Sequence, residues 1–251
     1  MLEPWVYAAM TAIAVLTGII DAIAGGGGLI MMPALLTAGL SPVNALATNK
    51  LQSVFGTGVA MTNFARKGHI DWKSNRLTFA FVFVGAVGGA LLVQWISVEA
   101  LGLIIPLLLV ASALYILLSP RMTDEDVHHR LSARGYAPVA GSIGVYDGFF
   151  GPGTGTFFTT SIVSLRGHGL TRATALTKAF NFTSNVASVI VFVLGGKMVW
   201  LLGLCMAAGA MVGGWIGSHT AMRYGASVIR PLLVVISLAM TGRLLWGYFT
   251  G

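Results

Sequence analysis

Uncharged apolar runs, each close to the length of a membrane-spanning helix, recur along this chain and constrain its fold more than any other feature. They cover residues 77–97, 101–118, 179–196 and 198–222, and also 231–249, which is broken only by Arg243. A helix needs about 20 such residues to cross the hydrocarbon core of a bilayer. Charged residues make up only 9% of the 251, whereas soluble domains carry about a quarter. We therefore predict an all-α polytopic membrane protein.

The first apolar run begins near Trp5, with no basic segment before it and no small-residue cleavage pattern after it. We expect a retained span rather than a signal peptide. The single cysteine, Cys205, excludes a disulfide within the chain. The net charge of +7 is expected to lie in cytoplasmic loops and not to bind nucleic acid, because multispanning proteins gather basic residues on that side.

The chain contains an internal repeat. Gly18-Ile-Ile-Asp21 matches Gly144-Val-Tyr-Asp147 at an offset of 126, and Lys50, Trp72 and Gly89 match Lys178, Trp200 and Gly217 at an offset of 128. Such a repeat indicates two related units. We assign residues 1–118 to the first repeat of the membrane domain, 119–136 to a charged cytoplasmic linker and 137–251 to the second repeat.

The number of segments in each half decides how the halves are oriented. Four long spans and a short run after the glycines, 29–40 in the first half, give five segments if a broken or tilted helix lets the short run cross. With five, nearly all basic residues lie on one side and Lys197 alone on the other; with four, Arg166, Arg172, Arg223 and Arg230 move across. The positive-inside rule thus favours two inverted five-helix repeats, with both termini outside.

Two glycine-rich stretches, 25–28 and 151–155, cannot hold a straight helix. Unwound backbone at membrane depth persists only where it is buried in protein or lines a wet cavity. We predict broken helices whose new N-termini point inward and attract anions, as in transporters with a midplane site. The alternative, close helix packing, fits Gly85-x-x-x-Gly89 and Gly209-x-x-x-Gly213-x-x-x-Gly217 better.

Charged residues inside apolar segments usually mark a pathway. Asp21 and Asp147 are related by the repeat, as are Lys50 and Lys178, whereas Arg243 has no counterpart and is expected to snorkel or to close an ion pair. Carboxylates are poor anion ligands. The aspartates therefore cap the following helices, pair with the lysines, or take up and release a proton that couples transport to a gradient.

Polar residues surround both lysines at helical spacing. Asn49, Gln52 and Ser53 share one face beside the first lysine, and Asn181 and Asn185 share the face of the second. Amide and hydroxyl donors beside an ammonium suit a small oxyanion, and hydrogen bonding between helices is the alternative. In the linker, His128 and His129 beside acids could hold a metal, but a solvated loop is the simpler interpretation, and we expect no metal or other cofactor.

The stretches 18–30 and 45–52, with Asp147-Gly-Phe-Phe-Gly-Pro-Gly-Thr-Gly155 and 175–181, resemble the sulfite exporter TauE/SafE family of membrane transporters. The resemblance covers about residues 8–246 and implies a bacterial inner-membrane permease for small sulfur-containing anions, with protons as a suspected coupling ion. The expected substrate-binding residues are Gly25, Gly26, Gly27, Gly28, Asn49, Lys50, Gln52, Gly151, Gly153, Thr154, Gly155, Thr177, Lys178 and Asn181. Asp21 and Asp147 are expected to be coupling or structural residues.

Other functions receive less support. His69, His168 and His219 are scattered and form no HExxH motif, which argues against an intramembrane enzyme. A scaffold gains nothing from paired buried charges. An anion channel without gradient coupling is the main alternative to a transporter.

The proton hypothesis predicts that Asp21→Asn abolishes pH-driven flux while anion binding persists, because the amide cannot carry the coupling proton. Flux into vesicles under an imposed pH gradient measures this. Unchanged pH-driven flux in the variant counts against a coupling role for Asp21.

Overall fold

The computed structural model describes residues 2–119, 125–126 and 131–224, and within them the chain is all helical, as predicted. The helices are α1 (Pro4–Ala24), α2 (Gly28–Thr37), α3 (Pro42–Arg66), α4 (Arg76–Gln94), α5 (Val98–Leu118), α6 (Ala133–Phe149), α7 (Thr154–Arg166), α8 (Leu170–Leu194) and α9 (Trp200–Tyr224). Five of these are long and apolar enough to cross a membrane: α1, α4, α5, α8 and α9. The run 231–249, Arg243, His128 and His129 lie outside the described residues.

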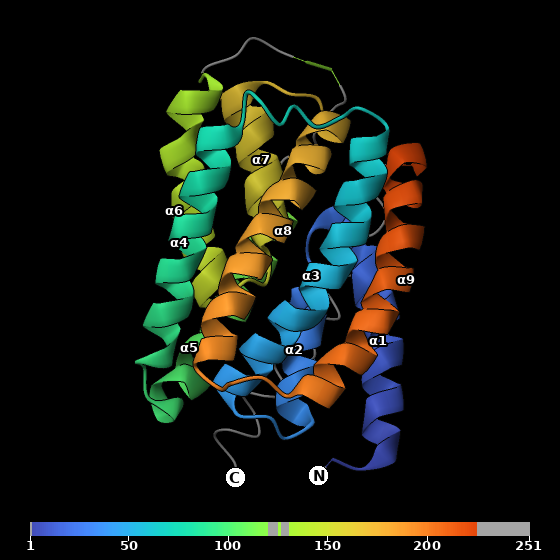
Figure 1. Cartoon of the computed structure of the whole chain (residues 1–251), viewed down its shortest axis with the longest axis vertical. Helices are drawn as coiled ribbons and strands as arrows, with labels where there is room; N and C mark the ends of the chain where they lie inside the picture. The colour runs from blue at the N-terminus through green and yellow to red at the C-terminus, as the bar shows by residue number, and fades with distance from the viewer. Residues whose placement is uncertain (1, 120–124, 127–130, 225–251) are drawn as a thin grey trace.

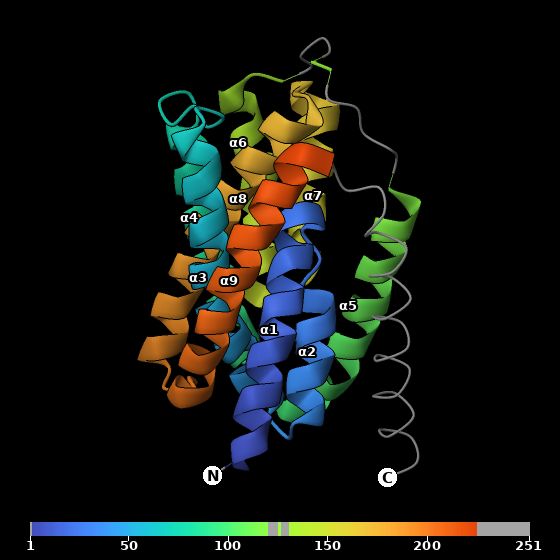
Figure 2. The same cartoon turned by 90° about the vertical axis from the view of Figure 1, so that its right-hand side faces the viewer.

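The first glycine stretch reverses the chain. α1 ends because Gly25 takes the left-handed conformation, with φ of 76°, which glycine adopts without a steric penalty. α2 has 10 residues, or about 15 Å of helix, about half the hydrocarbon thickness. Figure 2 shows α2 running back beside α1 toward the end where the chain begins. The hairpin of α1 and α2 therefore begins and ends at the N-terminal end of the molecule, from which α3 also starts.

The second half begins earlier than predicted. α6 starts at Ala133, inside the expected linker, because Ser132 caps it with a hydroxyl oxygen that accepts the Gly135 N–H at 3.1 Å. After Gly153, at φ 87°, α7 runs back to the end of the molecule where α8 begins (Figure 1). Both glycine stretches thus join a long helix to a short returning one.

Helices related by the sequence repeat run in opposite directions in Figure 1. α1, α3 and α9 rise from the end that holds the N-terminus, and α6, α8 and α4 descend toward it. The opposite end, called here the basic end, carries Arg66 at the end of α3, Arg76 at the start of α4, Arg166 at the end of α7 and Arg223 in the last turn of α9. Lys197 lies between α8 and α9, at the N-terminal end.

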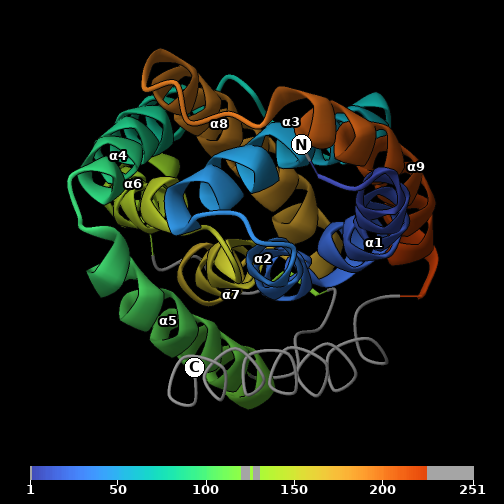
Figure 3. The same cartoon turned by 90° about the horizontal axis from the view of Figure 1, so that it is seen from below.

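The two halves of the chain pack against each other through close backbone contacts at glycines. α1 packs along α9 and α4 along α6, and the two pairs lie on opposite sides of the bundle in Figure 3. A Cβ on Gly89 of α4 would lie 2.0 Å from the Val145 carbonyl oxygen, and one on Gly213 of α9 would lie 2.2 Å from that of Val15. The predicted packing role of these glycines is confirmed, because no side chain fits between the backbones.

Two apolar clusters lie toward opposite ends of the bundle. One includes Leu29, Met31 and Met32 of α2, with Leu202 and Met206 from the first turns of α9, toward the N-terminal end, and it continues along α5 as far as Ile116. The other includes Phe64 from the end of α3, Tyr136 from the start of α6, Phe158 of α7 and Phe180 of α8, and lies toward the basic end. Buried polar residues, described next, occupy the level between them.

Alanine variants of Gly89 and of its neighbour Gly88 test the backbone contact between the two halves. A Cβ on Gly88 would meet nothing within 4 Å, so Gly88→Ala should be neutral or stabilise by up to about 1 kcal/mol through helix propensity. Gly89→Ala should destabilise by about 1–3 kcal/mol through overpacking. Thermal unfolding of the two purified variants in detergent compares them, and equal midpoints would contradict the packing model.

Candidate functional site

The two glycine stretches, one from each half, meet in the middle of the molecule. A Cβ on Gly25 would lie 2.5 Å from the carbonyl carbon of Gly155, and one on Gly28 would lie 3.2 Å from Cα of Pro152. The Thr156 hydroxyl donates to the Ala24 carbonyl oxygen at 2.9 Å. The end of α1 and the start of α7 therefore touch backbone to backbone, which only glycine allows.

A polar cavity of about 30 Å³ opens beside this contact, with space for about one or two waters. Predicted residues in its wall are Asp21, Gly25, Gly28, Asn49, Lys50, Asp147, Gly151, Gly153, Thr154, Gly155 and Asn181. Ser53, Thr57 and Asn185 complete the wall. The remaining predicted residues, Gly26, Gly27, Gln52, Thr177 and Lys178, do not line it. Gly27 and Gln52 line a second cavity of about 20 Å³, which shares Asp21, Gly28, Ser53 and Thr57 with the first.

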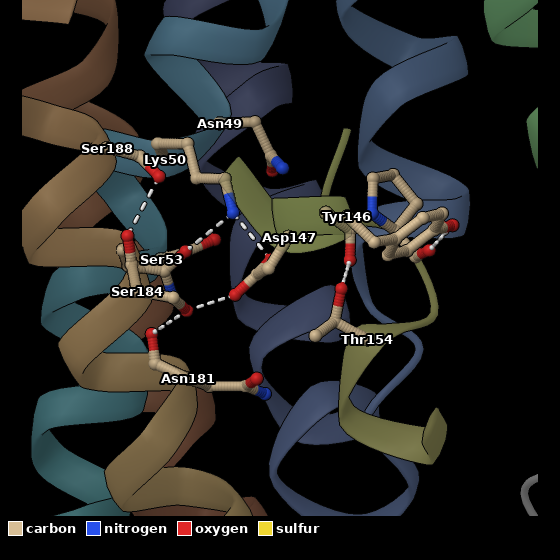
Figure 4. A network of polar contacts seen from close by, with 12 residues as sticks. Asn49, Lys50, Ser53, Tyr146, Asp147, Thr154, Asn181, Ser184 and Ser188 are labelled. Atoms are coloured by element: carbon tan, nitrogen blue, oxygen red, sulfur yellow. Dashed lines mark hydrogen bonds and ion pairs between the residues drawn. The ribbon is translucent and has the colours of Figure 1, made fainter. Parts of the chain in front are cut away.

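Lys50 is the cation of the cavity wall, and it is fully engaged by the other half. Its side chain is 2% exposed, and its Nζ lies 2.5 Å from Oδ1 of Asp147 and donates to Oδ1 of Asn185 at 3.1 Å. The second carboxylate oxygen accepts the Ser184 hydroxyl, as Figure 4 shows. Burying an ion pair is tolerated only when such additional hydrogen bonds offset the lost hydration.

The repeat-related pair has a different setting. Lys178 is 1% exposed and donates both to the Asp21 carboxylate, at 3.3 Å, and to the Asp21 carbonyl oxygen in the last turn of α1. A cation at a helix C-terminus is stabilised by the helix dipole. The Asp21 side chain is 28% exposed, against 4% for Asp147. The lysines therefore do not share one chamber in this conformation.

Of the roles predicted for the aspartates, pairing is the one observed, and each aspartate pairs with the lysine of the other half. The capping prediction is wrong. Gly27 and Gly153 occupy the N-cap positions of α2 and α7, and neither cap has a side-chain hydrogen bond. Neither aspartate occupies the N-cap position from which a side chain reaches the first N–H groups of a helix.

The other polar side chains of the site are held in place by hydrogen bonds between hydroxyl, amide and carbonyl groups. Asn49 accepts a hydrogen bond from Gln52 at 3.0 Å, Thr154 donates to the Gly151 carbonyl oxygen at 2.6 Å, and Thr177 bonds to Thr159 at 3.0 Å.

Sequence reasoning missed two residues of the site. Tyr146, beside Asp147, donates to the Pro152 carbonyl oxygen at 2.7 Å and so supports the second glycine stretch. Its place within the repeated motif was the available signal. Thr57 of α3 also lines the cavity, one turn beyond Ser53. Among the described residues, no group of three or more His, Cys, Asp or Glu is placed to hold a metal.

Alanine variants of Gly25 and Gly39 test the contact between the two glycine stretches. Both have positive φ, 76° and 89°, but a Cβ on Gly39 would meet nothing within 4 Å. Gly39→Ala should cost only the left-handed penalty of about 1–2 kcal/mol. Gly25→Ala adds a clash with the Gly155 backbone, so we expect a much larger fall in unfolding temperature. Similar unfolding temperatures for the two variants would show that this contact does not constrain the fold.

The chain is similar to known proteins along nearly its whole length. The family model described as sulfite exporter TauE/SafE matches residues 10–244. "Probable membrane transporter protein YfcA" of Escherichia coli (strain K12) is 42% identical over 98% of this chain and 92% of its own length. "Probable membrane transporter protein ORF9" of Sinorhizobium sp is 46% identical over 92% of this chain and 89% of its own length. No solved structure matches the chain. The chain thus belongs to the sulfite exporter TauE/SafE family of membrane transporters.

Proposed function

We propose that this protein is a secondary transporter that moves a small sulfur-containing anion, such as sulfite, a sulfonate or thiosulfate, across the bacterial inner membrane. Protons are the proposed coupling ion. The observation that carries the proposal is the polar cavity where the two glycine stretches meet, with a buried ammonium in its wall. The family of the chain sets the class of protein, and the cavity suggests the class of solute.

The proposal includes two inverted repeats, each with a helix broken at its glycine stretch. The opposite directions of α1 and α6, of α3 and α8, and of α4 and α9 support inversion. The left-handed glycines before the short α2 and α7 support the breaks. Transporters built from inverted repeats bind their solute at such breaks, where the repeats meet.

The chemistry of the cavity supports an anion. Gly28 and Thr154, the first residues of α2 and α7, line it, so two positive helix ends point toward the same small volume. The ammonium of Lys50 and the amide of Asn49 lie in the same wall. Donors from several helices can surround a small oxyanion, and exclusion of bulk water strengthens each contact.

The two apolar clusters support alternating access rather than an open pore. The cavity lies between the cluster around Met31 and Met32 and the cluster around Phe158 and Phe180. A transporter opens one such barrier at a time, whereas a conducting channel needs both open together. The distribution of charge supports a cytoplasmic location for the basic end, because positive residues remain on that side.

Uptake by the purified protein in liposomes tests the proposal. Thiosulfate and sulfite uptake should saturate and should be inhibited by each other. Lys50→Gln should reduce uptake at least tenfold, because it removes the ammonium, whereas Lys73→Gln, in the exposed α3–α4 loop, should leave uptake unchanged. Current that grows without saturation would favour the channel alternative, and uptake insensitive to Lys50→Gln would reject this site.

A further inference from the structure

An anion that enters the cavity meets an ammonium that is already neutralised. Lys50 bonds to Asp147 and Asn185, and Asp147 bonds in turn to Ser184, within a network that is almost completely buried (Figure 4). A carboxylate and a small oxyanion are both pure hydrogen-bond acceptors with negative charge. They therefore compete for the same ammonium.

If the Asp147 carboxylate and the anion both stay ionised beside one buried lysine, the free energy cost is high. Two like charges in a medium of low dielectric repel strongly, and this favours the neutral form of the one that can take a proton. A protonated Asp147 also becomes a donor. Asn181, on the wall of the same cavity, has a buried Oδ1 without a hydrogen-bond partner among the described residues, and this oxygen can accept.

We propose that the Asp147 carboxylate forms an ion pair with Lys50 when no anion is bound, and that Asp147 takes up one proton each time an anion binds to Lys50. This inference rests on the proposed function. In the empty site, the Asp147 carboxylate neutralises the Lys50 ammonium. In the loaded site, the carboxyl is neutral and the anion pairs with the ammonium, so the net charge of the buried group is zero for a singly charged anion and minus one for a dianion such as thiosulfate. When the anion leaves, the proton leaves Asp147 and the ion pair reforms.

The geometry assigns this role to Asp147 rather than to Asp21, so the proposal departs from the sequence-based prediction that Asp21→Asn abolishes pH-driven flux. Within the described part of the chain, the ionisable side chains on the cavity wall are Asp21, Lys50 and Asp147. Asp21 from α1 is held by Lys178 from α8, whose ammonium lies outside the wall. Asp21 is also partly exposed, so its carboxylate is less enclosed by the protein than that of Asp147. α4 and α7, which pack against α6, place no described ionisable side chain in the cavity.

Thiosulfate is a suitable probe because its own charge stays constant between about pH 5.5 and 7.5, whereas sulfite titrates. Its binding to the purified full chain is measured by calorimetry across this range, in buffers of different ionisation enthalpy, which also gives the number of protons taken up. Because protonation favours binding, the wild-type Kd should rise about tenfold per pH unit where Asp147 is ionised. One proton should be taken up per thiosulfate.

Two matched variants separate the carboxylates. Asp147→Asn should bind thiosulfate with a Kd independent of pH, at least tenfold tighter than wild type at the upper end of the range, and without proton uptake. Asp21→Asn, whatever its absolute affinity, should keep the wild-type slope and the proton. If Asp147→Asn does not yield folded protein, the wild-type proton count and the Asp21→Asn slope decide on their own.

Several results would overturn the inference: a wild-type Kd that does not change with pH, an Asp147→Asn variant that keeps the slope, or an Asp21→Asn variant that loses it. Binding by the double variant Lys50→Gln, Asp147→Asn would also overturn it, because that variant lacks the ammonium. If wild type and Asp147→Asn both fail to bind thiosulfate and sulfite at any pH, the proposed function fails, and the inference fails with it.

Discussion

The structure depends on the neutralisation of four charges inside an apolar helical bundle. Lys50 pairs with Asp147 and Lys178 with Asp21, so each pair joins the two halves of the chain. A lone buried ion would cost several kcal/mol, and removing one partner of such a pair is strongly destabilising. The glycine stretches make this pairing possible, because a Cβ on Gly151 would lie 2.9 Å from the Lys50 ammonium nitrogen. The same glycine therefore permits the turn and makes room for the charge.

Local sequence patterns predicted the features that depend on one segment at a time. Apolar runs located the spans, and small residues at every fourth position identified the packing faces of α4 and α9. The repeat singled out the four residues of the two ion pairs, but it did not say which lysine meets which aspartate, because the tertiary arrangement of the halves determines that pairing. The backbone contact between Gly25 and Gly155 at the turn before α2 was not predicted, because it joins residues 130 positions apart.

The symmetry of the sequence leads to an asymmetric site. The first stretch is four glycines, whereas the second has Pro152 and Thr154 in the corresponding places, and Tyr146 holds the Pro152 carbonyl oxygen. One aspartate is enclosed and the other is partly open to solvent. The two matching motifs thus form two similar ion pairs, and small local differences give the two aspartates different exposure.

The pairing of α1 with α9 and of α4 with α6 has a consequence for biosynthesis. When the first half has left the ribosome and entered the bilayer, α1 and α4 are present but their partners have not yet been made. The helix faces that will later contact glycines are then exposed to lipid. Asp21 and Lys50 have no counter-ions until Lys178 and Asp147 are translated. The N-terminal half of the chain is therefore an incomplete folding unit, which matures only after the C-terminal half has inserted against it.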